Sequence, residues 1–393
     1  MITTLAVENY RSLRRLIVPL RQLNVVTGAN GSGKSSLYRA LRLLADSARN
    51  GAVAALAREG GLPSTLWAGP ETTGRAVRDG RYPVQGTVRT KPVNLRLGFA
   101  GTDFGYAVDL GLPPSDSYSM FNLDPEIKRE CVWSGPLLRP AALLTVRSGS
   151  AVRIRAADGS WEYAHDVLRP YDSMLSELAD PQRAPDLLKL REQIRSWRFY
   201  DHVRTDARAP ARTAQIGTRT PVLSHDGSDL AAALQTIREV GNREALDMAV
   251  DAAFPGSRVE IVDHGGRFEL ALRQPGLLRP LGAAELSDGT LRYLLWTAAL
   301  LTPRPPALMV LNEPETSLHP DLLGPLAELI LTASKNCQIV AVTHAAPLVS
   351  ELEKGVERRG TDVHTIALAK EFGQTGVVGQ GTLDEPRWEW PKQ

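Results

Sequence analysis

The fold expected for this chain follows from the stretch Gly28-Ala29-Asn30-Gly31-Ser32-Gly33-Lys34-Ser35. It follows the apolar run at 23–27 and precedes apolar residues at helical spacing: Leu37, Ala40, Leu41 and Leu44. This pattern predicts a strand, a glycine-rich turn and an amphipathic helix. The spacing G-x-x-x-x-G-K-S is that of a P-loop, whose backbone N–H groups surround a phosphate at a helix N-terminus. A flexible glycine-serine turn, the alternative, would not explain why Lys34 and Ser35 follow.

The P-loop motif assigns a role to each of its last two residues. The Lys34 ammonium is expected to reach the β- and γ-phosphates of a nucleotide, and the Ser35 hydroxyl is expected to contact Mg²⁺. ATP and Mg²⁺ are therefore the expected ligands.

The composition sets bounds on the class of protein. The chain has 393 residues, of which 43% are apolar and 23% charged, with a formal net charge of +2. Cys131 and Cys337 are solitary, so neither a disulfide framework nor a cysteine-based metal site is expected. The N-terminus has no basic region followed by a long apolar core, and the longest apolar run, 293–301, is too short to span a bilayer. We expect a cytoplasmic protein without a membrane segment.

A basic segment lies at 189–220. It carries eight Lys/Arg against three acidic residues, with Trp197, Phe199 and Tyr200 between them. Such a segment can follow a nucleic-acid backbone, which makes DNA a candidate partner. The alternative is a solvated arginine face whose aromatic residues pack inward.

A second strand with polar residues at its end follows in the last third of the chain. The apolar run 307–311 ends in Asn312-Glu313-Pro314-Glu315. This is typical of a buried parallel strand, whose carboxyl end is where α/β sheets place ligands. Acidic residues there form a Walker-B element, and Glu313 is placed to polarise an attacking water as general base.

Three further motifs surround this strand. Leu286-Ser287-Asp288-Gly289-Thr290 precedes a helical run, with Ser287 as a natural N-cap and Gly289 leaving room for a phosphate. The segment 317–321 begins Ser-Leu-His-Pro, with His319 at its centre, and the buried strand 338–343 ends before His344. A histidine at that strand end can hydrogen-bond a γ-phosphate or the attacking water.

The order of these motifs resembles that of the ABC-type ATPases of the SMC, RecF and OLD group, and most closely that of the single-head RecF-like ATPases. The resemblance covers about residues 1–50 and 280–350. It implies an α/β fold of the ABC/SMC-head P-loop NTPase type, with a mostly parallel central sheet, an antiparallel β lobe and a helical insertion.

The same resemblance implies a division into domains. The ATP-binding head would comprise 1–50 with 280–393. An antiparallel β-rich lobe would occupy 51–165, and a mainly helical insertion with the basic segment and a hairpin would occupy 166–279. Residues 51–280 would replace the long coiled coil of the larger relatives.

The resemblance also implies the roles of the site residues. Glu313 would be the catalytic glutamate, His344 the switch histidine and Lys34 a catalytic phosphate contact. Ser287, Asp288 and Gly289 would be a signature motif acting in trans on the nucleotide of a second subunit, with His319 in the D-loop, so that an ATP-dependent homodimer is implied. The nucleotide-binding residues would be Asn30, Gly31, Ser32, Gly33, Lys34, Ser35 and Ser36, and the Mg²⁺ contacts Ser35 and Asn312.

Two departures from the family pattern bear on activity. Asn312 stands where Walker B normally has aspartate, and an amide has no charge to favour the cation, so slower hydrolysis or weaker Mg²⁺ binding is expected. Glu315 is a candidate to compensate. The position of the Q-loop is open, with Gln85 as a candidate.

These motifs predict an ATPase whose ATP-dependent dimerisation drives a conformational switch in DNA repair or in defence against foreign DNA. The alternative is a hydrolysis-weak, nucleotide-gated module that recruits DNA or a partner effector protein. A P-loop kinase is disfavoured because the signature and D-loop motifs would have no task there. About fifty residues follow His344, too few for a Toprim nuclease domain, and no H-E-x-x-H spacing occurs, so the chain is not expected to cut DNA by itself.

Overall fold

The computed structural model describes residues 1–49, 51–70, 93–114, 116, 118–164, 167–201, 203–360, 362–381 and 383–391. The chain divides into two compact units. The first comprises Met1–Arg21, Thr27–Ser196 and Ile366–Gln393, and the second comprises Gln22–Val26 and Trp197–Thr365. The chain therefore passes between the units within the strand that leads to the P-loop.

The first unit contains an eight-stranded antiparallel sheet in the order β2-β1-β4-β5-β6-β7-β8-β9. Its strands are β1 (Ile2–Tyr10), β2 (Leu13–Pro19), β4 (Leu95–Gly101), β5 (Phe104–Gly111), β6 (Glu126–Ser134), β7 (Leu143–Ser148), β8 (Ala151–Arg155) and β9 (Trp161–Tyr163). β4, β5, β6, β7, β8 and β9 lie in the range 51–165, where an antiparallel β-rich lobe is expected. Gln85, the candidate for the Q-loop, lies outside the described residues.

Helices and a C-terminal hairpin complete the first unit. The helices are α1 (Lys34–Ser47), α2 (Ala52–Arg58), α3 (Leu62–Thr65), α5 (Met174–Glu177) and α6 (Pro185–Ser196), with a 3₁₀ turn at Pro140–Ala142. The end of β17 (Val363–Glu371) pairs antiparallel with β18 (Gln374–Val377). In α1 the residues Leu37, Leu41 and Leu44 are buried, as their helical spacing predicts.

A buried ion pair joins β6 and β7 to the segment before α5. Glu130 and Arg147 are both fully buried, with Arg147 Nη1 3.6 Å from Glu130 Oε2. Glu130 also accepts hydrogen bonds from the Tyr106 hydroxyl (2.6 Å), the Ser173 hydroxyl and the backbone N–H of Met174 (2.8 Å). A buried charge is tolerated only when it is paired and hydrogen-bonded, so this network fixes the segment to the sheet.

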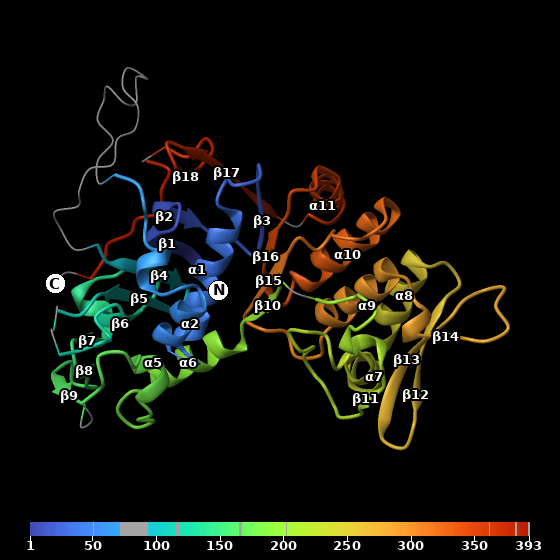
Figure 1. Cartoon of the computed structure of the whole chain (residues 1–393), viewed down its shortest axis with the longest axis horizontal. Coiled ribbons are helices and arrows are strands. Elements are labelled where there is room, and N and C mark those ends of the chain that lie inside the picture. The colour runs from blue at the N-terminus through green and yellow to red at the C-terminus, as the bar shows by residue number, and fades with distance from the viewer. Residues whose placement is uncertain are drawn as a thin grey trace. The chain divides into compact units, whose positions relative to one another are not determined.

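The second unit is built on parallel strands. β10 (Arg198–Tyr200) pairs with β15 (Leu308–Asn312), β15 with β16 (Gln338–Val342), and β16 with the residues of β3 (Leu23–Gly28) that belong to this unit. β15 and β16 lie side by side in Figure 1. Every residue of β16 is buried, as the continuous apolar run predicts.

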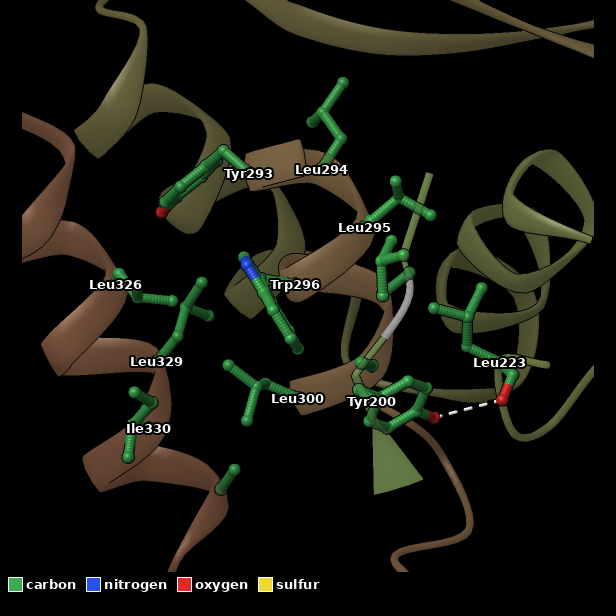
Figure 2. Close-up of a cluster of buried hydrophobic side chains, with 14 of the residues drawn as sticks. Tyr200, Leu223, Tyr293, Leu294, Leu295, Trp296, Leu300, Leu326, Leu329 and Ile330 are labelled. Atoms are coloured by element: carbon green, nitrogen blue, oxygen red, sulfur yellow. Dashed lines mark hydrogen bonds between the residues drawn. The ribbon is translucent and has the colours of Figure 1, made fainter. Parts of the chain in front are cut away.

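Helices pack around this sheet and form one large apolar core. They are α7 (Leu230–Val240), α8 (Arg243–Ala253), α9 (Asp288–Leu300), α10 (Leu323–Ala333) and α11 (Ala346–Arg359). Figure 2 shows Trp296 of α9 among leucines of α9 and α10. The Tyr200 ring meets Trp296 edge-on at 6.1 Å, and its hydroxyl donates to the Leu223 carbonyl at 3.0 Å. β10 is thereby anchored in the core.

A small antiparallel sheet leads into α9. β12 (Arg258–Asp263) and β13 (Arg267–Arg273) form the expected hairpin, and β11 (Gln215–Ile216) and β14 (Leu281–Gly282) also pair with β13. Short 3₁₀ turns lie at Pro210–Arg212, Ala283–Glu285 and Pro320–Leu322.

These elements confirm the predicted fold class, with a parallel sheet, an antiparallel β-rich part and helices. The three-part division into head, β-rich lobe and insertion stays a prediction. Among the residues that the structure describes, none of the helices has the length and apolar character needed to cross a membrane.

We expect Glu130→Gln to lower the free energy of unfolding by roughly 3–5 kcal/mol, because it leaves the Arg147 guanidinium buried without its counter-charge. Urea unfolding followed by circular dichroism measures the effect. The matched control is Glu162→Gln, which breaks the pair with Arg183 at 2.9 Å where Glu162 is half exposed, and should cost no more than about 1 kcal/mol. Equal effects of the two variants would contradict this role of the network.

Candidate nucleotide-binding site

Two glycines of the P-loop sit where a side chain would not fit. Gly28 has φ +145°, and a Cβ there would lie 2.3 Å from the Leu368 carbonyl oxygen. Gly33 has φ +109°, and its Cβ would lie 2.2 Å from the Thr375 hydroxyl. Both positions require glycine because of backbone conformation and because of close neighbours. The loop therefore has the tight form that the motif predicts.

The N-terminus of α1 is open to an anion. Its N-cap, Gly33, provides no side-chain hydrogen bond, and the first turn contains no acidic residue. The first N–H groups of a helix lack partners within the helix, and the helix dipole favours negative charge there. Ser35, in this first turn, is exposed, as are Asn30 and Gly31 of the loop. These features suit a phosphate group.

Backbone carbonyl groups of the loop hold the Lys34 side chain in place. Its side chain is largely buried, and its ammonium donates to the carbonyl oxygens of Gly28 (2.6 Å) and Ala29 (3.1 Å). The buried Ser32 hydroxyl has no hydrogen-bond partner within the described chain. The loop thus presents one fixed positive charge and one unsatisfied hydroxyl.

One residue that shapes the loop carries no signal in the sequence. Thr375 of β18 is fully buried, and its hydroxyl lies 2.8 Å from both the Ser32 carbonyl oxygen and the Ser12 hydroxyl. Its backbone N–H donates to the Ser12 carbonyl at 2.8 Å. The C-terminal hairpin therefore braces the P-loop together with the turn between β1 and β2. No motif marks a threonine so far along the chain.

In the second unit, three parallel strands end level at one edge. The pairing register sets Asn312 of β15 beside Val342 of β16, and Val342 beside Val26 of β3. The next residues after these strands are Glu313 and Thr343, and β3 continues toward the P-loop. This carboxyl edge is where such sheets bind ligands.

Glu313 and His344 come together at this edge. His344 Nδ1 lies 3.5 Å from Glu313 Oε1, and both side chains are about half exposed. The backbone N–H of Glu313 donates to the Val342 carbonyl at 2.7 Å, and its φ is +48°. A residue other than glycine in this region carries strain of about 1–3 kcal/mol and is found mostly at functional sites. The two predicted residues are therefore neighbours, as their places at adjacent strand ends require.

Glu315 fastens the loop after β16. Its side chain is 7% exposed, and Oε1 accepts hydrogen bonds from the Thr343 hydroxyl (2.5 Å) and the His344 backbone N–H (3.3 Å). His344 Nδ1 lies 3.6 Å from the same oxygen, so the imidazole is flanked by two carboxylates. Glu315 Oε2 is buried without a hydrogen-bond partner in the part of the chain that is described.

The structure has few protein groups for a metal ion. Asn312 is partly buried at the end of β15, and no group of three or more His, Cys, Asp or Glu with metal-binding geometry occurs among the described residues. Mg²⁺ in nucleotide sites is held mainly by phosphates and waters with one or two protein groups. The exposed Ser35 hydroxyl at the phosphate-binding turn fits that pattern.

The signature turn, residues 286–290, forms the capped start of α9. It packs against the expected D-loop segment, residues 317–321. Ser287 Oγ accepts the Thr290 N–H at 3.1 Å, which confirms Ser287 as the N-cap of α9. A Cβ on Gly289 would lie 2.9 Å from the Ser317 carbonyl oxygen. His319 contacts Asp321 at 3.2 Å, and its side chain remains 71% exposed. Glycine at 289 thus allows the two segments to approach.

The aromatic residues of the basic segment 189–220 are not exposed to solvent. Trp197, Phe199 and Tyr200 are buried, so the alternative in which they pack inward is the one observed. The Arg191 side chain is 14% exposed, Arg195 donates to the Ala48 carbonyl at 3.0 Å, and Arg212 is buried. The segment therefore offers no aromatic surface for base stacking at these three positions.

The parallel sheet, the glycine-rich turn and the residues at the strand ends define a P-loop ATPase of the ABC/SMC-head type. The chain belongs to the family described as "AAA domain, putative AbiEii toxin, Type IV TA system", whose model matches residues 23–351. This family implies nucleotide binding, usually with Mg²⁺.

The chain is similar to solved SMC head structures, one of which reaches a TM-score of 0.50 and supports the fold. An SMC head bound to the C-winged helix domain of ScpA has a TM-score of 0.50 at 13% identity, covering 96% of this chain and 97% of that chain. The SMC head domain from Thermotoga maritima scores 0.44 at 14% identity, covering 97% and 99%. An Smc head domain with an extended coiled coil bound to the C-terminal domain of ScpA, derived from Pyrococcus furiosus, scores 0.48 at 12%, covering 96% and 95%. No curated protein matches the chain significantly.

We expect Glu315→Gln to lower the rate of ATP turnover roughly tenfold or more, because an amide removes the charged acceptor that holds Thr343 and His344. Phosphate release at saturating ATP measures the rate. Glu351→Gln is the control. Glu351 lies on α11, and its side chain forms an ion pair at 2.7 Å with the exposed Lys354 of the same helix. A wild-type rate in Glu315→Gln would show that this hydrogen-bonded loop does not matter for turnover.

Proposed function

We propose that this protein binds ATP with Mg²⁺ at residues 28–36 and hydrolyses it with Glu313 as the general base. The contact between Glu313 and His344 at the carboxyl edge carries the proposal. The register of β3, β15 and β16 supports it, because the strand that leads to the P-loop ends level with the strands that lead to these two residues. Glu313 and His344 thereby lie at the carboxyl edge of the parallel sheet, where sheets of this kind bind ligands.

The residues have distinct tasks in this reaction. The N–H groups of the P-loop and the Lys34 ammonium bind the β- and γ-phosphates. The Ser35 hydroxyl and the Asn312 amide would hold Mg²⁺, which neutralises phosphate charge when it is bound. Glu313 takes a proton from water as the water oxygen bonds to the γ-phosphorus, and the bond from that phosphorus to the bridging oxygen breaks to release ADP. His344 hydrogen-bonds the water or the γ-phosphate.

A second candidate function is a nucleotide-gated switch with weak hydrolysis. The observation that favours it is Asn312 at the end of β15, where a carboxylate would attract the cation more strongly. Glu315 supplies a buried carboxylate nearby in the chain, but its Oε1 is committed to Thr343 and His344.

The signature turn supports a composite site. Ser287 is exposed, and the Asp288 and His319 side chains are 59% and 71% exposed. We propose that Ser287, Asp288 and Gly289 contact ATP held by a second copy of the chain, so that ATP drives homodimerisation. In this arrangement the exposed N-terminus of α9 binds an anionic ligand, the ATP of the second copy.

The pathway that we propose is defence against foreign DNA or DNA repair, in which the ATP-dependent switch acts on a partner. The family description names a putative toxin of a type IV TA system, and a toxin–antitoxin system has two components. An SMC head was solved bound to a domain of ScpA. Both descriptions favour a partner protein over direct DNA contact through the segment 189–220, whose aromatic residues are buried.

We expect Lys34→Ala and Glu313→Gln each to reduce phosphate release by roughly a hundredfold or more, since one removes a phosphate contact and the other the base. Nucleotide affinity should separate them: Lys34→Ala weakens ATP binding, whereas Glu313→Gln retains it. Wild-type turnover in Glu313→Gln would mean that another group is the base. Wild-type protein that dimerises with ATP without releasing phosphate would favour the switch.

Mixing two inactive variants tests the composite site. Lys34→Ala disables the P-loop of its own chain, and Ser287→Arg blocks the site of the partner chain. Each alone should be inactive. An equal mixture should recover about one quarter of the wild-type rate, because half of the dimers are mixed and each of these has one intact site. Absence of any recovery would contradict a signature that acts in trans.

A further inference from the structure

Arg212 makes an unusual number of contacts with the signature turn. It ends the 3₁₀ turn Pro210–Arg212 between β10 and β11, and the residue is 8% exposed. Its guanidinium donates to five carbonyl oxygens and forms an ion pair with Asp288 at 2.6 Å. The carbonyl oxygens belong to Thr205 (2.8 Å), Asp206 (3.1 Å), Ala283 (3.0 Å), Ala284 (3.3 Å) and Leu286 (2.7 Å).

These contacts fix the turn on both sides of Ser287. The Leu286 carbonyl precedes Ser287 and the Asp288 carboxylate follows it, and one guanidinium binds both. A guanidinium has five N–H donors in a rigid fork, so it holds its partners at fixed positions relative to one another. A buried charge without its counter-ion costs several kcal/mol, so the Asp288 carboxylate is needed to keep Arg212 in place.

The same guanidinium ties the turn to the small antiparallel sheet. β11, just after Arg212, pairs with β13 through Gln215 and Phe268. β14, just before the signature turn, pairs with β13 through Leu281 and Leu272. Both segments that Arg212 joins are therefore anchored to one strand. This leaves the turn little freedom to move independently of that sheet.

We propose that Arg212 is the positioning residue of the signature motif: it holds Ser287 and Gly289 in the geometry in which they bind nucleotide on a second copy of the chain. This inference rests on the proposed trans function. Arg212 lies in the segment that the sequence associates with nucleic acid, but its donors are committed to the protein. Asp288 serves as its counter-charge, which gives the third residue of the motif a role within its own chain.

The test compares Arg212→Lys, which keeps the charge but loses the fork, with Asp288→Asn, which keeps the size of the side chain but removes the charge that Arg212 faces. The controls are Arg243→Lys and Asp247→Asn, which alter an ion pair at 3.6 Å on α8 whose side chains are 64% and 49% exposed. The measurements are the affinity of the isolated chain for ATP and the phosphate-release rate at saturating ATP.

We expect both test variants to bind ATP within about twofold of wild type and to release phosphate roughly tenfold more slowly, because they misplace only the trans contacts. Their effects should not add in the double variant, since both act on one contact. The controls should match wild type. Wild-type turnover in both test variants would overturn the proposal, as would an equal loss of affinity and turnover, which indicates general destabilisation.

Hydrogen exchange separates this inference from the proposed function. If wild-type protein neither dimerises with ATP nor releases phosphate, the proposed function fails. Amides 284–290 should still exchange roughly tenfold faster in Arg212→Lys than in wild type, while amides 34–47 of α1 keep their protection. Unchanged exchange at 284–290 would overturn the positioning role itself.

Discussion

Parallel pairing of β3, β15 and β16 is the constraint on which the candidate site depends. Because Val26, Asn312 and Val342 share one level of the sheet, the residues that follow them emerge at the same edge. The chain can therefore place Glu313 and His344 side by side although thirty residues separate them. This arrangement needs only the correct register, which continuous apolar strands buried on both faces stabilise.

Buried charges then fix the turns that leave the sheet. Glu315 binds the loop that carries His344, and Arg212 binds the turn that carries Ser287. In each case a side chain that would be costly to bury alone is satisfied by backbone groups of a functional loop. Glu130 and Arg147 use the same physics in the first unit, where they fasten one segment to the eight-stranded sheet. The segment that Glu130 holds differs from the other two because it carries none of the candidate site residues.

Asn312 bears on the choice between the two proposed functions, hydrolysis and a nucleotide-gated switch. A neutral amide at the end of β15 leaves less negative charge for a cation, and Glu315 is occupied with the neighbouring loop. A site of this kind depends more strongly on the phosphates and on Ser35 to hold Mg²⁺. This charge distribution favours slow turnover, the behaviour expected of the proposed nucleotide-gated switch.

Several elements could be predicted from the sequence because local patterns encode them. The P-loop, the capped start of α9 at Ser287, the hairpin β12–β13 and the apolar strands β15 and β16 all follow from spacing and turn chemistry that involve residues close in the chain. Motif order alone also placed Glu313 and His344 at strand ends. The roles of Thr375 and Arg212 could not be predicted from the sequence, because their partners lie far away in the chain. Thr375 contacts Ser12 and Ser32, and Arg212 contacts residues 283–288. The aromatic residues at 197–200 show the same limit, since the polarity of their neighbours suggested a surface, whereas all three are buried and Tyr200 packs edge-on against Trp296 of α9.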